Sequence, residues 1–408
     1  MPPRLIYLDN GSTSWPKAPS VAQAMADAVT HPVGNPGRGQ HHISQATGEV
    51  TMRLRRVLAK RINAPAPERI CLSSGATASM NMALLGLLWF TPRPAGERPI
   101  VVTTSIEHNA VRRPLLHQQR EGVCEIVEIP CDAEGFVEAE AVIEAATEPR
   151  CVAVVMSSCS NVLGTIQPIE AVGRGLRERA LQVLLIVDAA QSMGALPMDV
   201  QAMGIDVLVF SGHKALLGPA GIGGMYLSDR AYSTTGIAGE GGPIRPTCFG
   251  GTGGTLRGSI EELNPPEMPG VFEVGTTNTV GQAGLLAALE DESMPTWEES
   301  LAQERRLLSM FLERFGGEDR VRLLGPRGVD RRHGVVSFTV SGYTAQEVSA
   351  YLESEWGIIC RAGLHCAPGA HRAMGTLEQG AVRVSPGPLT TEEEMGSLIE
   401  AVEGLLES

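Results

Sequence analysis

Lys214 is the residue whose type and position first indicate covalent chemistry. The chain has three lysines, Lys17, Lys60 and Lys214. The last of them ends the run DVLVFSGHK, whose apolar and β-branched residues are typical of a buried strand. A desolvated lysine amine gives up its proton more easily and can form a Schiff base, which a guanidinium cannot do. A solvated loop lysine is the alternative interpretation, since most lysines are exposed.

A second strand-like run, VLLIVD, ends in the carboxylate of Asp188. An ionised acid at the end of an apolar strand is costly unless it meets a cation. The cofactor pyridoxal 5'-phosphate supplies one, because it combines a lysine Schiff base with a pyridinium nitrogen that pairs with an acid. Lys214 and Asp188 together therefore predict this cofactor.

The stretch CLSSGATASMNMAL passes from a strand pattern into a helix pattern. Gly75, Ala76 and Thr77 would offer backbone N–H groups and a hydroxyl at a helix N-terminus, where a phosphate binds well. Ser211 and His213, beside the lysine, are further donors. A helix cap without a ligand would look similar. The glycines of GPAGIGG lack the order of a dinucleotide-binding turn and are explained by tight packing.

The elements that must position these residues alternate between strand and helix patterns. Strand-like runs occupy residues 70–73, 100–104, 152–157, 183–188, 206–211 and 223–227. Amphipathic segments such as 76–89 and 170–179 lie between them, which predicts an α/β fold with a mostly parallel sheet. Ligands of such sheets bind beyond the carboxyl ends of the strands.

Glycine and proline crowd residues 236–270, which predicts a long loop or a bordering hairpin. Beyond it, helix patterns mix with short strands, as in a separate, smaller α+β domain. We expect a large cofactor-binding domain over residues 15–265 and a connecting segment over 266–279 that meets a second subunit. Residues 1–14 and 280–408 are expected to form the small domain.

The composition excludes some partners. The 408 residues carry a formal charge of −13, so nucleic acid and anionic membranes would repel the chain. The longest apolar run, residues 82–90, is too short to cross a bilayer, and MPPRLIYLDN lacks a targeting pattern. We expect a cytoplasmic protein whose eight irregularly spaced cysteines are free thiols, mostly buried.

The ordered motifs resemble those of class V aminotransferases, a group of fold-type I pyridoxal-phosphate enzymes, and specifically the Suf-type or group II cysteine desulfurases. The resemblance covers nearly the whole chain. Its motifs are YLDNGSTS, GNPGRGQHHIS, SSGATASMN, EHNA, SNVLGT, VDAAQSMG, FSGHKALLGPAGIGG, FEVGTTNT, RAGLHCAPGAH and VRVS. It implies the two-domain fold of that group.

The resemblance also implies roles around the cofactor. Lys214 would bind it covalently, Asp188 would pair with the ring nitrogen and His108 would stack on the ring. Asn161 would lie near the phenolic oxygen and the substrate, and Gln191 would bond that oxygen. The phosphate would be bound by Thr77, Ser211, His213 and, from a neighbouring subunit, Thr276. Shared sites of this kind imply a homodimer.

The loop RAGLHCAPGAH bears on the choice among pyridoxal reactions. Cys366 stands beside His365, and a partly exposed thiol near basic groups is more readily a thiolate. In desulfurases the matching cysteine takes the substrate's sulfur. The resemblance therefore implies conversion of L-cysteine to L-alanine, a persulfide on Cys366, and a protein as sulfur acceptor. A buried structural cysteine is the alternative for the residue. Alternatives for the protein are a C–S lyase, a selenocysteine lyase, an aminotransferase or a non-catalytic scaffold.

Candidate substrate-binding residues lie near that loop. Arg383, in the strand pattern AVRVS, suits a bidentate grip on the substrate's α-carboxylate, although a solvated strand arginine is the alternative. Arg361 is a second candidate and is expected to position the Cys366 loop or the dimer partner. His41 matches a histidine near the active-site entrance of the family. Because His41 and His42 have no third ligand at workable spacing, we expect no metal.

Two departures from the Suf-type pattern leave the acceptor and the substrate open. Leu364 stands where those enzymes have the first of two histidines. Residues Pro386–Thr391 lack the Tyr-Asn-Thr ending that follows the carboxylate-binding arginine. Cys248, in the glycine-rich segment, remains a second candidate thiol in a loop over the active site.

Overall fold

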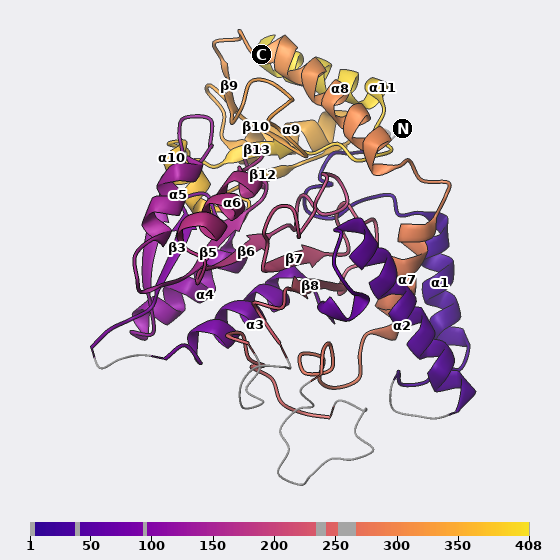
Figure 1. Ribbon diagram of the computed structural model, residues 1–408. Helices are drawn as coiled ribbons and strands as arrows, with labels where there is room; N and C mark the ends of the chain where they lie inside the picture. Colours follow the sequence, from indigo (N-terminus) through magenta and orange to yellow (C-terminus); the bar gives the residue numbers. More distant parts are fainter. Residues whose placement is uncertain (1–4, 37–40, 93–95, 234–241, 252–266, 408) are drawn as a thin grey trace.

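The structure, a computed structural model, describes residues 5–36, 41–92, 96–233, 242–251 and 267–407. A large lobe surrounds a seven-stranded sheet, and a smaller lobe with a four-stranded sheet lies at one end of it (Figure 1). Most of the glycine-rich stretch 236–270 lies outside the described residues. Within the described part, no helix combines the length and the hydrophobicity needed to cross a membrane.

The large sheet is mostly parallel, as predicted. Its strand order is β2-β8-β7-β6-β5-β3-β4, and β8 alone runs antiparallel to its neighbours β2 and β7. The strands are β2 (Ile70–Ser73), β3 (Ile100–Thr104), β4 (Glu125–Ile129), β5 (Cys151–Ser157), β6 (Leu184–Asp188), β7 (Val207–Ser211) and β8 (Gly223–Leu227). The sequence pattern missed only β4 among them, because that strand is the half-exposed edge of the sheet.

Both faces of this sheet are covered by helices, which explains why its central strands are mostly apolar up to their polar carboxyl ends. Val102, Leu185 and Phe210 point to one face, and their neighbours Val101, Ile186 and Val209 point to the other. The first face packs on α2 (His42–Arg61), α5 (Ala139–Ala146), α6 (Ile169–Arg179) and α7 (Thr279–Glu290). The second packs on α3 (Ala76–Leu88) and α4 (Asn109–Arg120).

Helix α7 lies with the large lobe, although the predicted boundary at residue 280 placed it in the small domain. It packs against α1 (Pro19–Thr30) and α2 (Figure 1). Leu285 and Leu286 are apolar and join the core of the large sheet, so hydrophobic burial holds the helix there. The exact extent of each domain stays a prediction.

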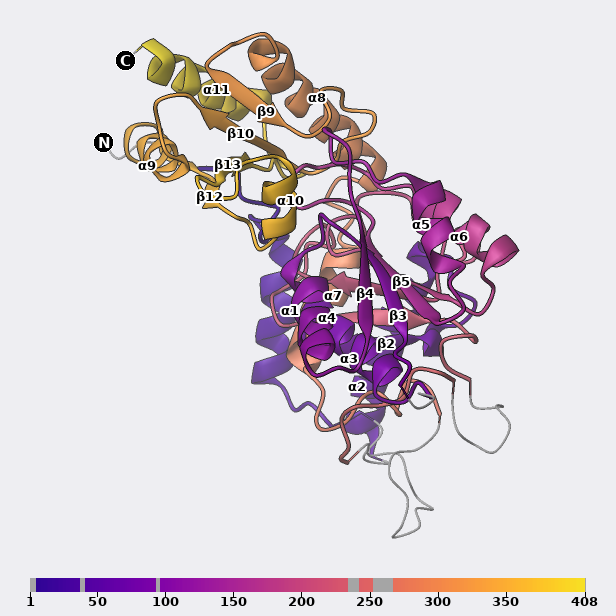
Figure 2. The same ribbon diagram turned by 90° about the vertical axis from the view of Figure 1, so that its left-hand side faces the viewer.

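The small lobe has its own core around an antiparallel sheet of order β12-β13-β10-β9. The strands are β9 (Val321–Leu324), β10 (Val336–Val340), β12 (Arg361–Gly363) and β13 (Ala381–Val384). Its helices are α8 (Trp297–Phe315), α9 (Ala345–Trp356), α10 (Pro368–Ala373) and α11 (Glu392–Glu407). Near the N-terminus, β1 (Ile6–Tyr7) pairs with β11 (Ile358–Ile359) of this lobe. Figure 2 shows the same lobe from the side, with α10 facing the large lobe.

A buried histidine of the small lobe pairs with an acid of that lobe and contacts the large lobe. Nδ1 of His333, between β9 and β10, lies 2.8 Å from Oε1 of Glu304 on α8. Its Nε2 lies 3.3 Å from the backbone oxygen of Gln191 in the large lobe. Burial lowers the pKa of His333, but the charge and hydrogen bond of Glu304 outweigh burial and the pKa is raised. An imidazolium here donates to both lobes.

His333→Gln is expected to destabilise the protein in a pH-dependent way. Because the pKa is raised in the folded state, folding takes up a proton. The stabilisation is complete below about pH 6.5, the value for free histidine, and is lost as pH rises through the folded pKa. Urea unfolding of the cofactor-free protein should show a loss of about 1.5–3 kcal/mol at pH 6 and a smaller one at pH 9. An equal loss at both pH values would contradict the charged pair. The exposed His117→Gln is the control.

Candidate active site

Most of the predicted residues meet around a cavity of about 170 Å³ at the carboxyl edge of the large sheet. Ser157, Asp188 and Ser211 end the neighbouring parallel strands β5, β6 and β7, so they share this edge. Loops after the strands and the starts of α3 and α4 complete it. The remaining lining residues are Ala76, Thr77, His108, Ala110, Cys159, Asn161, Ala190, Gln191, His213 and Lys214.

Lys214 and Asp188 lie in this cavity with opposite charges. Burial lowers the pKa of the Lys214 amine to about 8, while the charge of Asp188 raises it and those of Arg383 and Arg361 lower it. Asp188 is itself buried, and its Oδ1 accepts a 2.9 Å hydrogen bond from the N–H of Ala190. Near neutral pH this amine can therefore exist as the neutral nucleophile or base as well as the cation.

The start of α3 brings several hydrogen-bond donors together. Gly75 precedes it with φ = +145°, a conformation that favours glycine, and supplies no side-chain cap. Ser211 Oγ lies 3.4 Å from the N–H of Ala76. The nearby Nδ1 of His213 is buried and has no hydrogen-bond partner. Because burial, with Lys214 and Lys17, lowers the pKa of His213 to about 4, the ring is neutral. These groups suit an anion that accepts several hydrogen bonds.

The N-terminal segment holds the loop that carries Lys214. Sequence reasoning missed this contact between the segment and the loop. The backbone oxygen of His213 accepts hydrogen bonds from Ser14 N at 2.9 Å, Ser14 Oγ at 3.1 Å and Thr13 Oγ1 at 3.2 Å. The ammonium of Lys17 donates to the same oxygen at 3.0 Å, and burial lowers its pKa to about 8. The rarity of lysine in this chain was a signal that could have indicated Lys17.

Two arginines from the small lobe lie beside Lys214. Arg361 on β12 and Arg383 on β13 stand directly opposite each other, and both guanidinium groups donate to Ser12 Oγ. Arg383 is buried and also donates to Asp9 Oδ1 at 2.7 Å and to the backbone oxygen of Asn161 at 3.0 Å. Like charges opposite each other on a sheet are unfavourable. Asp9 supplies one carboxylate to these two arginines, so a second anion would stabilise the two positive charges further.

Cys366 is exposed, and its loop is fixed to the cavity. The Nδ2 of Asn161 donates to the backbone oxygen of His365 at 2.6 Å, and the N–H of Asn109 donates to that of Cys366 at 2.7 Å. Arg361 Nη2 lies 3.6 Å from the Cys366 sulfur. The prediction that Cys366 lies near basic groups holds for Arg361. The imidazole of His365 is buried and bonded elsewhere, so it does not act on the thiol.

Glu107 is a buried acid behind the cavity that the sequence pattern did not single out. Its carboxylate accepts hydrogen bonds from Thr104 Oγ1, Ser157 N and Ser157 Oγ at 2.5, 3.0 and 2.7 Å. Burial raises its pKa to about 7 against these bonds. Glu107 therefore links Thr104 of β3 to Ser157 of β5, and His108 is the next residue in the sequence. The Nδ1 of His108 accepts from Ala110 N at 3.0 Å, and burial lowers its pKa.

Three other predicted residues do not line this cavity. Gly75 lies next to it through Ala76. His41 is exposed at the N-cap of α2, where its ring contacts Ser44. Thr276 is exposed and accepts a 3.2 Å hydrogen bond from Asn35 Nδ2. Cys248 is exposed, and most of its loop lies outside the described residues. Among the remaining cysteines, Cys71, Cys124, Cys151 and Cys159 are buried.

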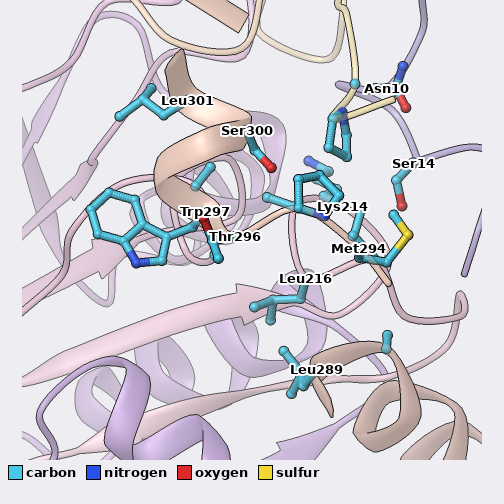
Figure 3. Close-up of a pocket in the computed structure, with 18 of the residues that line it drawn as sticks. Asn10, Ser14, Lys214, Leu216, Leu289, Met294, Thr296, Trp297, Ser300 and Leu301 are labelled. Atoms are coloured by element: carbon cyan, nitrogen blue, oxygen red, sulfur yellow. The ribbon is translucent and has the colours of Figure 1, made fainter. Parts of the chain in front are cut away.

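A second cavity, of about 770 Å³, borders the other side of the Lys214 loop. Figure 3 shows Trp297, Ser300 and Leu301 on one side of it and Leu216, Met294 and Leu289 below. Pro386, Gly387 and Pro388, the segment that departs from the Suf-type pattern, also line it. Lys214 therefore borders both cavities, and residues of both lobes line the larger one.

Comparisons with known proteins agree with this geometry. Residues 6–398 match the family described as Aminotransferase class-V. The chain belongs to this family. The probable cysteine desulfurase of Pyrococcus abyssi is 31 % identical to this chain, and the match covers 99 % of this chain and 95 % of the relative. That of Vibrio cholerae is 30 % identical over 98 % of this chain and 93 % of the relative.

Solved structures share the architecture as well. The apo structure of a cysteine desulfurase from Thermococcus onnurineus NA1 has a TM-score of 0.88 at 29 % identity and covers 99 % of this chain and 95 % of that one. The predicted fold type I is thereby confirmed. Class-V aminotransferases and cysteine desulfurases are pyridoxal-phosphate enzymes. The donors at the start of α3, the unpartnered Nδ1 of His213 and the Lys214–Asp188 pair fit that cofactor.

Lys214 of the cofactor-free protein is expected to lose its proton near pH 8, and Asp188→Asn is expected to lower this midpoint, because Asp188 is the main charge that raises the pKa. The measurement is pulsed acetylation at a series of pH values, with the Lys214 peptide quantified by mass spectrometry. Asp319→Asn, an exposed aspartate on the small lobe, is the control. An unchanged midpoint in Asp188→Asn would show that this carboxylate does not act on the amine.

Proposed function

We propose that the protein is a pyridoxal-phosphate-dependent cysteine desulfurase that converts L-cysteine to L-alanine and receives the sulfur on Cys366. The observation that carries the proposal is an exposed thiol whose loop is bonded to the cavity through Asn161. The names of the relatives support it. A non-catalytic scaffold would not need a buried lysine that faces an acid.

The cofactor would be held by the residues around the smaller cavity. Lys214 would bind it covalently, Asp188 would face its ring nitrogen, and His108 and Gln191 would contact the ring and its phenolic oxygen. The phosphate would occupy the donor set of Gly75, Ala76, Thr77, Ser211 and His213, joined by Thr276 of the second subunit in a homodimer. When bound, this cofactor supplies an electron sink that stabilises negative charge at the substrate's α-carbon.

The chain's own residues would then bind and orient the substrate. Arg383 and Arg361 form a positive site for the α-carboxylate, which would become the second anion between two opposed arginines. The Lys214 amine, with a pKa of about 8, can hold or release a proton at neutral pH. It is therefore suited to take the proton from the α-carbon.

Sulfur transfer would use the Cys366 thiolate. Its sulfur forms a bond to the substrate sulfur, and the carbon–sulfur bond of the substrate breaks with its electron pair staying on carbon. Protonation of that carbon completes L-alanine. L-Cysteine and the Cys366 thiol thus yield L-alanine and a Cys366 persulfide, with no outside oxidant. Arg361, 3.6 Å from the thiol sulfur, favours the anionic nucleophile.

Cys366→Ser is expected to abolish sulfide and alanine production from L-cysteine with dithiothreitol present, by at least about 100-fold. Both products are measured, since a lyase or aminotransferase would keep its turnover in this variant. Cys248→Ser, which changes the other exposed thiol, is the matched comparison and is expected to retain activity. Equal sulfide production by wild type and Cys366→Ser would remove the persulfide step.

Borohydride treatment of the protein with pyridoxal 5'-phosphate is expected to leave one stable adduct, on Lys214, detected by peptide mass spectrometry. Lys214→Ala should lose both the adduct and the cofactor's absorbance near the visible–ultraviolet border. Lys60→Met removes an exposed lysine far from this loop in sequence and should keep the adduct. Absence of an adduct at position 214 in the wild type would overturn the enzymatic proposal. The cytoplasmic location and a protein sulfur acceptor stay predictions.

A further inference from the structure

Two buried histidines and a threonine form a chain of hydrogen bonds behind Cys366. Thr376 Oγ1 lies 2.9 Å from His371 Nδ1, His371 Nε2 lies 3.2 Å from His365 Nδ1, and His365 Nε2 lies 3.1 Å from the backbone oxygen of Arg361. The three side chains are at most 2 % exposed. The reaction described above uses none of them.

The last acceptor sets the direction of this chain. A backbone oxygen can only accept, so His365 Nε2 must carry a hydrogen. In a neutral ring, His365 Nδ1 is then an acceptor, and His371 Nε2 must donate to it. His371 Nδ1 is in turn an acceptor and receives the hydroxyl hydrogen of Thr376. The hydroxyl also lies 3.4 Å from the backbone oxygen of His371, but its 2.9 Å contact with Nδ1 is the shorter, and Nδ1 carries no hydrogen of its own in this neutral ring.

The reverse direction would require His365 to donate from both ring nitrogens, and hence to carry a charge. Burial disfavours the charged ring and lowers the pKa of His365 to about 3 and that of His371 to about 4. Arg383 and Arg361 oppose a further positive charge on His365. Both rings are therefore neutral, and the donors all point from Thr376 toward Arg361.

The chain ends on the turn that presents the thiol. His365 and Cys366 have φ of +51° and +59°, a left-handed backbone that non-glycine residues adopt only when their surroundings impose it. The His365 ring bonds back to residue 361 and so closes the segment between Arg361 and Cys366. The backbone oxygen of His365 is held from the other side by Asn161. Arg361, whose backbone oxygen accepts the hydrogen bond from His365, also reaches the Cys366 sulfur with its side chain.

We propose that Thr376, His371 and His365 are positioning residues that fix the Cys366 turn and the Arg361 contact through one directed hydrogen-bond chain. The proposal rests on the proposed function of Cys366. The hydrogen-bond chain does not deprotonate the Cys366 thiol, because His365 Nδ1 already accepts a hydrogen bond from His371. Its loss would slow the attack of Cys366 on the substrate sulfur without changing how the cofactor is held.

The test compares Thr376→Val, which removes the hydroxyl at nearly constant volume, with Thr376→Ser, which keeps it. In a single turnover with L-cysteine, Thr376→Val should form the Cys366 persulfide about 10- to 100-fold more slowly, the scale of a small misplacement of reacting groups. The cofactor absorbance should be unchanged, because the chain includes none of the residues that would hold the cofactor. Thr376→Ser should behave as wild type.

A second variant pair guards against a failure to fold. His371→Gln retains an N–H that can reach His365, whereas His371→Met does not. Rescue by glutamine but not by methionine supports the chain. Wild-type persulfide rates in both Thr376→Val and His371→Met would overturn it. So would a parallel loss of cofactor absorbance and activity, because that pattern indicates general destabilisation.

A measurement without substrate separates this inference from the proposed function. Iodoacetamide should alkylate Cys366 at least about threefold more slowly in Thr376→Val, because the Arg361 contact that favours the thiolate is loosened. The alkylation of Cys248 in the same sample is the internal reference. If the wild type forms no persulfide, the desulfurase proposal fails, while the alkylation rates still test the chain. Equal Cys366 rates in Thr376→Val and wild type would contradict the positioning role.

Discussion

An amine held out of water beside a single carboxylate is the constraint on which the site depends. Burial lowers the pKa of Lys214 to about 8, and the charge of Asp188 opposes that shift. The parallel sheet makes this possible, because β6 and β7 end side by side and place both residues at one edge. The same edge carries the uncapped start of α3 and the unpartnered ring nitrogen of His213, so covalent attachment and anion binding fall in one place.

The small lobe and the N-terminal segment complete the site by adding charge and rigidity. Thr13, Ser14 and Lys17 hold the carbonyl of His213 and hence the start of the Lys214 loop. Arg361 and Arg383 bring two like charges together above it, balanced by one aspartate. Such an arrangement is stable only with an anion close by, which is why an amino-acid carboxylate is a reasonable ligand. The large lobe, the small lobe and the N-terminal segment therefore all contribute residues to one site.

Sequence reasoning succeeded where chemistry and local pattern coincide. Lys214, Asp188 and the Gly75–Thr77 turn each lie within a few residues of an apolar strand, so both their chemistry and their place could be predicted. Sequence reasoning placed His365 among the basic groups near the Cys366 thiol, whereas its imidazole is buried and bonded elsewhere. Neighbours in sequence need not share surroundings, and the left-handed backbone at His365 and Cys366 sends one side chain into the core and the other to the surface. Glu107 and His371 were missed because their partners are buried and their sequence context is ordinary.

The sequence by itself determined the order of strands and helices, the mostly parallel sheet and the cofactor chemistry. Hydrophobic periodicity and strand ends are local properties that a chain displays before it folds. Only the tertiary structure decided what surrounds the reactive groups. The pairing of Asp9 with Arg383 joins residues 374 positions apart, and the bond from Asn161 to His365 spans 204. Such contacts, and the desolvation that shifts the pKa of Lys214, exist only once distant segments pack together.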